Sequence, residues 1–94
     1  MTTINALEKV IKNEKLLEKY NLEKIGVFGS FARGEDSNDI DFYIDLDNYN
    51  LNRMLELRNE LAAITGKEVD IMLKKYANPI ILYRAIKDMK YVSK

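Results

Sequence analysis

Apolar residues recur near the start of the chain at the three- and four-residue spacing of an amphipathic helix. They are Ile4, Leu7, Val10, Ile11, Leu17 and Tyr20. Thr3 is a suitable N-cap, because its hydroxyl can accept a hydrogen bond from a main-chain N–H group of the first turn. The polar run over residues 12 to 15 interrupts the apolar stripe. We therefore expect a helix that bends or ends early before residue 21 and that covers a sheet.

Three later segments have the patterns of strands. One spans residues 24 to 28, is largely apolar and ends at Gly29. The other two alternate between apolar and polar residues over residues 39 to 46 and 67 to 73. Their apolar faces consist of Ile40, Phe42, Ile44 and Leu46 in the first and of Val69, Ile71 and Leu73 in the second. Because successive side chains of a strand point to opposite faces, each of these two strands has one face for a core and one polar face.

Two further helices and a short strand complete the pattern. An apolar stripe consists of Leu51, Met54, Leu55, Leu61 and Ala62 and ends at Thr65, with Gly66 just past the helix end. Asn78 and Pro79 are a cap and a first helical residue for a helix through residue 86, and residues 91 and 92 suit an edge strand. These elements predict one α/β (α+β) domain over residues 1 to 94, with a small mixed sheet and helices packed on one side.

Composition limits the chemistry that such a domain can perform. With 94 residues, 47% of them hydrophobic, the chain can build one modest core. It has no cysteine and no histidine, so a bound metal ion must be held by oxygen atoms. No apolar run approaches the roughly 20 residues that cross a bilayer. We expect a cytoplasmic protein with no membrane partner.

Charge is balanced overall but unevenly distributed. The formal net charge is zero. Residues 35 to 47 hold only acids among their charged residues, whereas residues 74 to 94 hold six bases and one acid, Asp88. The acidic block attracts cations, and the basic segment suits an anion or an acidic partner. Aromatic residues among the bases are too sparse to favour nucleic acid as the partner.

Aspartates occupy the polar faces of the two alternating strands. Asp39 and Asp41 point the same way, with α-carbons roughly 6.5 to 7 Å apart at the usual strand rise. If the two strands are neighbours, about 4.8 Å apart, Asp70 comes within reach of that pair. A single carboxylate on a strand is ordinarily just solvated, but like charges gathered on one face repel each other. Their concentration therefore predicts a hard cation bound by Asp39 and Asp41, with Asp70 within reach if the two strands pair.

A glycine-serine turn follows the first strand and suits a phosphate. Gly29 allows a ligand to approach the main chain, and Ser30 is expected to cap the short helical turn over residues 31 to 33. Free N–H groups at such a turn bind anions. Arg33 is expected either to neutralise phosphate charge or to form an ion pair with Glu35 or Asp36.

Four segments of the chain together resemble the motifs of the DNA polymerase β-type nucleotidyltransferase superfamily. They are Gly29-Ser30, Ala32-Arg33-Gly34, Asn38-Asp39-Ile40-Asp41-Phe42 and Glu68-Val69-Asp70-Ile71. More narrowly, the chain resembles the minimal nucleotidyltransferases, which are commonly encoded beside a HEPN-domain toxin as its antitoxin. The resemblance covers nearly the whole chain, although the loop from Ser30 to Asp39 is somewhat shorter than is common in these proteins.

The resemblance implies a site and a reaction. Asp39 and Asp41 would hold two Mg²⁺ ions, and Asp70 would complete one ion site and help to activate the attacking hydroxyl. Gly29 and Ser30 would hold the β- and γ-phosphates of a nucleoside triphosphate, ATP in the first instance. The resemblance further implies transfer of AMP to a tyrosine hydroxyl of a HEPN toxin, which would thereby be silenced.

Two other functions remain open at this point. The protein is either a catalytically silent antitoxin that neutralises its partner by binding, or an enzyme that adenylylates a small-molecule hydroxyl across a homodimer. Three intact acids favour an enzyme over a pure binder. The small size of the chain favours a protein acceptor, because little surface is left to enclose a small molecule. Tyr43 falls on the carboxylate face, either bordering the nucleotide site or serving a structural role.

Overall fold

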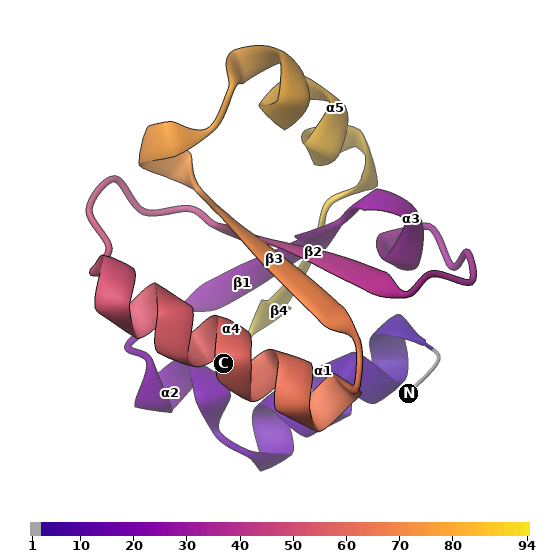
Figure 1. Ribbon diagram of the computed structural model, residues 1–94, viewed down its shortest axis with the longest axis vertical. Coiled ribbons are helices and arrows are strands. Elements are labelled where there is room, and N and C mark those ends of the chain that lie inside the picture. The colour runs from indigo at the N-terminus through magenta and orange to yellow at the C-terminus, as the bar shows by residue number, and fades with distance from the viewer. Residues whose placement is uncertain (1–2) are drawn as a thin grey trace.

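A computed structural model describes residues 3 to 94 (Figure 1). Met1 and Thr2, which belong to the predicted domain, lie outside the described residues. The elements follow in the order α1 (Ile4–Asn13), α2 (Leu16–Lys19), β1 (Lys24–Phe28), α3 (Gly29–Ala32), β2 (Asp39–Ile44), α4 (Leu51–Thr65), β3 (Glu68–Leu73), the 3₁₀ helix η1 (Lys74–Tyr76), α5 (Pro79–Asp88) and β4 (Lys90–Ser93). Of these, η1 was not expected from the sequence.

The four strands form one mixed sheet in the order β3-β2-β1-β4. β1 is antiparallel to both of its neighbours, whereas β2 and β3 are parallel. A parallel pair needs a crossover connection, which α4 provides. The predicted α/β class with a small mixed sheet is confirmed, and so is the short edge strand at the C-terminal end.

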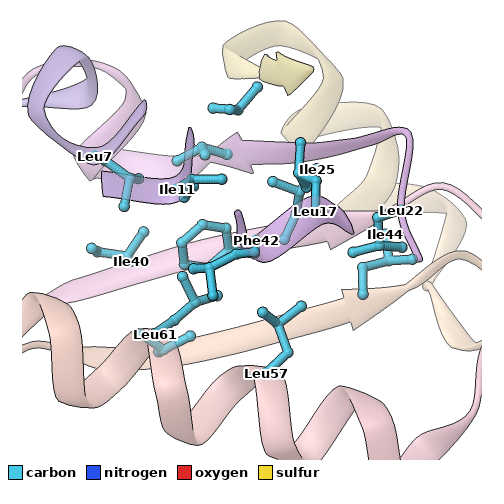
Figure 2. Close-up of a cluster of buried hydrophobic side chains, with 14 of the residues drawn as sticks. Leu7, Ile11, Leu17, Leu22, Ile25, Ile40, Phe42, Ile44, Leu57 and Leu61 are labelled. Carbon is cyan, nitrogen blue, oxygen red and sulfur yellow. The ribbon is translucent and has the colours of Figure 1, made fainter. Parts of the chain in front are cut away.

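The core lies between one face of this sheet and the layer formed by α1, α2 and α4. Ile40, Phe42 and Ile44 of β2 are completely buried there, against Leu57 and Leu61 of α4 (Figure 2). The predicted apolar face of this strand is thus confirmed over three of its four residues. Leu46 is the exception, because β2 ends at residue 44, and its side chain is exposed.

The N-terminal helix breaks where the polar run predicted a bend. Thr3 accepts a 3.1 Å hydrogen bond from the N–H group of Ala6, which confirms the N-cap. Lys15 adopts a left-handed conformation with φ of 53°, and the chain restarts as α2. The break turns Leu16 and Leu17 into the core together, although they are adjacent in sequence.

One helix departs from the prediction that the helices pack on one side of the sheet. In Figure 1, α5 lies on the side of the sheet away from α1, α2 and α4. The residue after it, Met89, lies over Gly26 of β1, where an added Cβ would meet the methionine sulfur at 2.5 Å. Glycine in β1 therefore makes room for the end of α5. Within residues 3 to 94, no helix is long and apolar enough to cross a membrane.

Candidate active site

The centre of the site is Asp41, which lies against the glycine turn. Phe28 at the end of β1 is the register partner of Asp41 in β2. An added Cβ at Gly29 would lie 2.6 Å from Oδ2 of Asp41, and Gly29 has a φ of +78°. Only glycine fits both constraints, because other residues avoid this φ and would displace the carboxylate. The turn and the carboxylate are thus built as one unit.

The register of the parallel strands brings the third aspartate beside the second. Asp70 of β3 is the register partner of Asp41, and Asp39 is the partner of Glu68. The expectation that the two acidic strands are neighbours is therefore confirmed. Asp41 is half-buried, whereas Asp39 and Asp70 are exposed. The three carboxylates lie on one face of the sheet, near Gly29, which directly follows the last residue of β1.

The electrostatics of this face favour a cation. Burial raises the pKa of the Asp41 carboxyl above its ordinary value, and the charges of Asp70 and Asp39 raise it further. The donor set consists of hard oxygens, which suit Mg²⁺. Among residues 3 to 94, however, no group of three or more acidic side chains is already gathered closely enough to hold a metal ion.

Ser30 does not cap the turn as predicted. α3 begins two residues earlier than expected, at Gly29, with Phe28 at the N-cap position and no side-chain cap bond. Ser30 therefore lies inside the first turn, where its main-chain oxygen accepts a hydrogen bond of 3.1 Å from the N–H group of Glu35. Its position beside Gly29 is unchanged by this correction.

Arg33 is engaged by two carboxylates. Its Nε atom lies 2.6 Å from a carboxylate oxygen of Glu35, so the predicted ion pair with Glu35 is formed. A terminal nitrogen of Arg33 lies 2.7 Å from Asp88. The predicted alternative partner Asp36 is not used. The hydrogen bond to Glu35, and to a lesser extent the one to Asp88, raises the pKa of the guanidinium above its ordinary value. The second bond ties α3 to α5, a link that no local pattern indicates.

Two pockets open beside Phe28. The one between α3 and α5 has a volume of about 260 Å³ and is lined by Phe28, Gly29, Arg33, Ile81, Arg84, Ala85 and Asp88. Arg84 is a site residue that sequence reasoning missed. The only signal was its place in the basic C-terminal segment. Among the described residues it forms no ion pair, in contrast to Arg33.

A larger pocket runs along the edge strand β3. Its volume is about 430 Å³, and its lining includes Phe28, Asp70, Met72 and Tyr76. Phe28 thus lines both pockets, the one at the glycine turn and the one at Asp70. The arrangement offers two adjoining spaces beside the carboxylates, which a reaction between two substrates requires.

Tyr43 of β2 and Asp45, which follows the strand, serve the structure. Tyr43 is buried, and its hydroxyl donates a long hydrogen bond of 3.5 Å to Asp45. Among the described residues it lines neither pocket, which favours the structural interpretation. Asp45 is half-buried, and its carboxylate lies 4.0 Å from the Nζ atom of Lys24 and 3.5 Å from that of Lys74.

A mixed sheet that places aspartates of two neighbouring strands beside a glycine turn defines the class of nucleotidyltransferases. The chain belongs to the family described as "Polymerase beta, Nucleotidyltransferase", whose model matches residues 8 to 94. The resemblance noted in the sequence is therefore confirmed.

Relatives and solved structures agree with this family. The chain is 34% identical to a predicted protein adenylyltransferase of Methanocaldococcus jannaschii, over 98% of this chain and 100% of that one. It is 31% identical to the protein adenylyltransferase MntA of Thermococcus cleftensis, over 98% of each chain. Its fold is similar to a structure of a tri-AMPylated Shewanella oneidensis HEPN toxin in complex with MNT antitoxin. There the TM-score is 0.66 and the identity 22%, over 90% of this chain and 71% of that one.

Proposed function

We propose that this protein is an Mg²⁺-dependent adenylyltransferase that moves AMP from ATP to a tyrosine hydroxyl of a HEPN-domain toxin and acts as its antitoxin. The observation that carries the proposal is the contact between the glycine turn and Asp41, with Asp70 in register beside it. This contact places the glycine turn, which would bind phosphate, directly beside the carboxylates that would bind the metal ions. Because the proposed enzyme consumes ATP, we expect this protein to work in the cytoplasm.

The carboxylates of Asp39, Asp41 and Asp70 are the proposed metal ligands. Burial first, and then the charges of Asp70 and Asp39, raise the pKa of Asp41, and a bound cation would offset this cost of holding it ionised. Two Mg²⁺ ions held there would neutralise triphosphate charge and make the acceptor hydroxyl more acidic.

The remaining residues bind and orient the two substrates. Main-chain N–H groups of Gly29 and Ser30 hold the β- and γ-phosphates, since the start of a helical turn carries positive partial charge. The acceptor oxygen attacks the α-phosphorus, the bond from that phosphorus to the oxygen bridging to the β-phosphate breaks, and pyrophosphate leaves. Asp70, at the pocket along β3, lies where the acceptor hydroxyl and its departing proton are expected.

Relatives and size both support a protein as the acceptor. Two relatives that match almost end to end carry the name protein adenylyltransferase. A solved structure of similar fold is described as a HEPN toxin that carries AMP together with its antitoxin. The pockets of this chain are shallow and lie at its surface, so a second polypeptide would close over them.

The test is the intact mass of the neighbouring gene's product, the expected HEPN-domain acceptor. That protein is incubated with this one, Mg²⁺ and each nucleoside triphosphate in turn. We expect a gain of one or more AMP groups with ATP, abolished by the double variant Asp39→Ala/Asp41→Ala. A stable complex without any mass gain would replace the enzyme with a binding antitoxin. Modification of a small-molecule hydroxyl alone would identify the other alternative.

A further inference from the structure

An exposed apolar surface covers η1 and the outer side of α5. Tyr76, Ile80, Tyr83 and Ile86 are each between 59% and 67% exposed. Outside residues 76 to 86, the large apolar side chains that are exposed reach at most 49%. Four such residues close together in sequence exceed what scattered surface hydrophobes explain. We call these four residues the α5 surface.

Helical geometry places three of these residues in one stripe. Ile80, Tyr83 and Ile86 follow each other at intervals of three, so they lie along one side of α5. Ala85, on the other side of the helix, is buried. α5 thus has an inner side that packs on the molecule and an outer side that is apolar without a covering element among the described residues.

Basic residues border the α5 surface. The Nζ atom of Lys87 lies 4.7 Å from the ring centroid of Tyr83, and that of Lys75 lies 5.8 Å from the ring of Tyr76. Arg84 adds a third exposed cation, and the one acid of the helix, Asp88, is already bound to Arg33. An apolar patch with this border fits a partner whose own apolar patch is bordered by acids.

The same charges disfavour a second copy as the occupant. In a two-fold symmetric dimer through α5, the identical patches of both chains would face each other. Arg84 and Lys87 of one copy would then approach the same bases of the other, with no acid free on the helix to separate them. A different protein with acidic residues meets no such repulsion.

The α5 surface meets the candidate site at Tyr76, which lines the pocket that contains Asp70. Ile81 and Arg84, on the same helix, line the space that also contains Gly29 and Arg33. A protein docked on the α5 surface therefore lies at the edge of the candidate site, next to the pocket where the acceptor hydroxyl is expected. We propose that the α5 surface is the docking site for the acceptor protein, through an apolar contact with an acidic border. This inference rests on the proposed function, since it concerns the same partner.

The experiment compares two substituted surfaces on the full-length protein. Ile80→Glu and Tyr83→Glu place an acid in the α5 surface, whereas the matched control Leu55→Glu places one at an exposed leucine of α4. Binding to the neighbour-encoded HEPN-domain protein is measured by calorimetry at two salt concentrations, and AMP transfer by intact mass. We expect each α5 variant to weaken binding about thirtyfold or more and the control to leave it unchanged. Lys87→Glu should also weaken binding and reduce its salt dependence.

The outcomes separate this inference from the proposed function. If the α5 variants bind and transfer AMP like the control, the docking site is elsewhere and the enzyme assignment stands. If binding depends on the α5 surface but the wild-type chain transfers no AMP to the partner, the docking site stands and the enzyme assignment fails. A protein that sediments alone as a dimer, and becomes monomeric with Tyr83→Glu, would show that a second copy occupies the surface and would overturn the proposal. So would the absence of any complex with the wild-type chain.

Discussion

The two faces of β2 are built for opposite purposes. On one face, Ile40, Phe42 and Ile44 are completely buried beneath α1 and α4. On the other face, Asp39 and Asp41 remain open enough to meet a ligand, and Asp41 is held against Gly29. One strand of six residues therefore carries both the centre of the core and the centre of the site.

The comparison teaches that stability and chemistry are separable here although they are interleaved in sequence. Burial of the apolar face stabilises the fold in proportion to the area removed from water. On the other face, burial and then the charges of Asp70 and Asp39 raise the pKa of Asp41, so its ionised carboxylate opposes folding unless a cation is bound. Substitutions at adjacent residues should therefore affect different measurements.

The largest expected effect is on activity at Asp41. Asp41→Ala should lower the rate of AMP transfer about a thousandfold or more, because it removes a central metal ligand. Its thermal midpoint should stay the same or rise slightly, since a repelled carboxylate is lost. The initial rate of mass gain and a melting curve check both halves. Full activity in this variant would show that the metal assignment is wrong.

Its neighbour should behave in the opposite way. Phe42→Ala should reduce the free energy of unfolding by roughly 3 to 5 kcal/mol, the cost of truncating a fully buried aromatic residue. Any folded molecules should retain their transfer rate at low temperature. Urea denaturation gives the free energy, and a loss below about 1 kcal/mol would contradict the assignment of the strand faces.

Two glycines offer a matched pair for the turn. Gly29 and Gly34 both have positive φ, but only an added Cβ at Gly29 would meet the Asp41 carboxylate, whereas at Gly34 it meets nothing within 4 Å. Each alanine variant should lose about 1 to 3 kcal/mol of stability through backbone strain. Only Gly29→Ala should also lose transfer activity, by about a hundredfold. Equal activity losses in the two variants would mean that the contact with Asp41 is irrelevant to catalysis.

Substitutions of the two arginines of the pocket should change activity less than those at Asp41 and Gly29. Arg84 forms no ion pair among the described residues, whereas Arg33 is engaged by Glu35 and Asp88. Arg84→Ala should therefore raise the KM for ATP about tenfold, with a smaller change for Arg33→Ala. Lys87→Ala, on the outer side of the same helix, is the control for ATP binding. A larger effect at Arg33 than at Arg84 would reverse these roles.

The smallest effect is expected on the stability of the protein when Glu60 of α4 is substituted. Glu60 accepts hydrogen bonds from Lys19 at 2.9 Å and Tyr20 at 2.7 Å, and these lower the pKa of its carboxyl. A lowered pKa stabilises the folded state above the unfolded pKa, and this contribution disappears as the pH falls through the folded value. Glu60→Gln should cost about 1 kcal/mol or less at pH 7, with no loss of activity. Denaturation at neutral and acidic pH should show the difference vanishing in acid.

Much of the fold was predictable because its signals are local. The caps at Thr3 and Asn78 follow from the hydrogen bonds that short polar side chains make to the next turn. Gly66 ends α4 in a left-handed conformation, as expected of glycine at that position. The faces of β2 and β3 follow from the period of two. The site residues Asp39, Asp41 and Asp70 were selected by the same pattern.

What was missed depends on contacts between distant segments. Ser30 was expected as a cap, but α3 starts two residues earlier, at Gly29, whose main chain lies against Asp41 of a neighbouring strand. The bond from Arg33 to Asp88 and the place of Arg84 follow from the packing of α5 across β1. These arrangements have no signal in a window of neighbouring residues.

By itself, the sequence determined which residues form helices and strands, which faces are apolar, and which carboxylates are available for a cation. It did so because propensity, capping and alternation act within a few residues. Only the tertiary structure decided that Asp70 lies in register with Asp41, that α5 lies on the side of the sheet away from the other long helices, and that its apolar outer side is left exposed. Those outcomes depend on strand pairing and helix packing between segments far apart in the chain, which no local preference specifies.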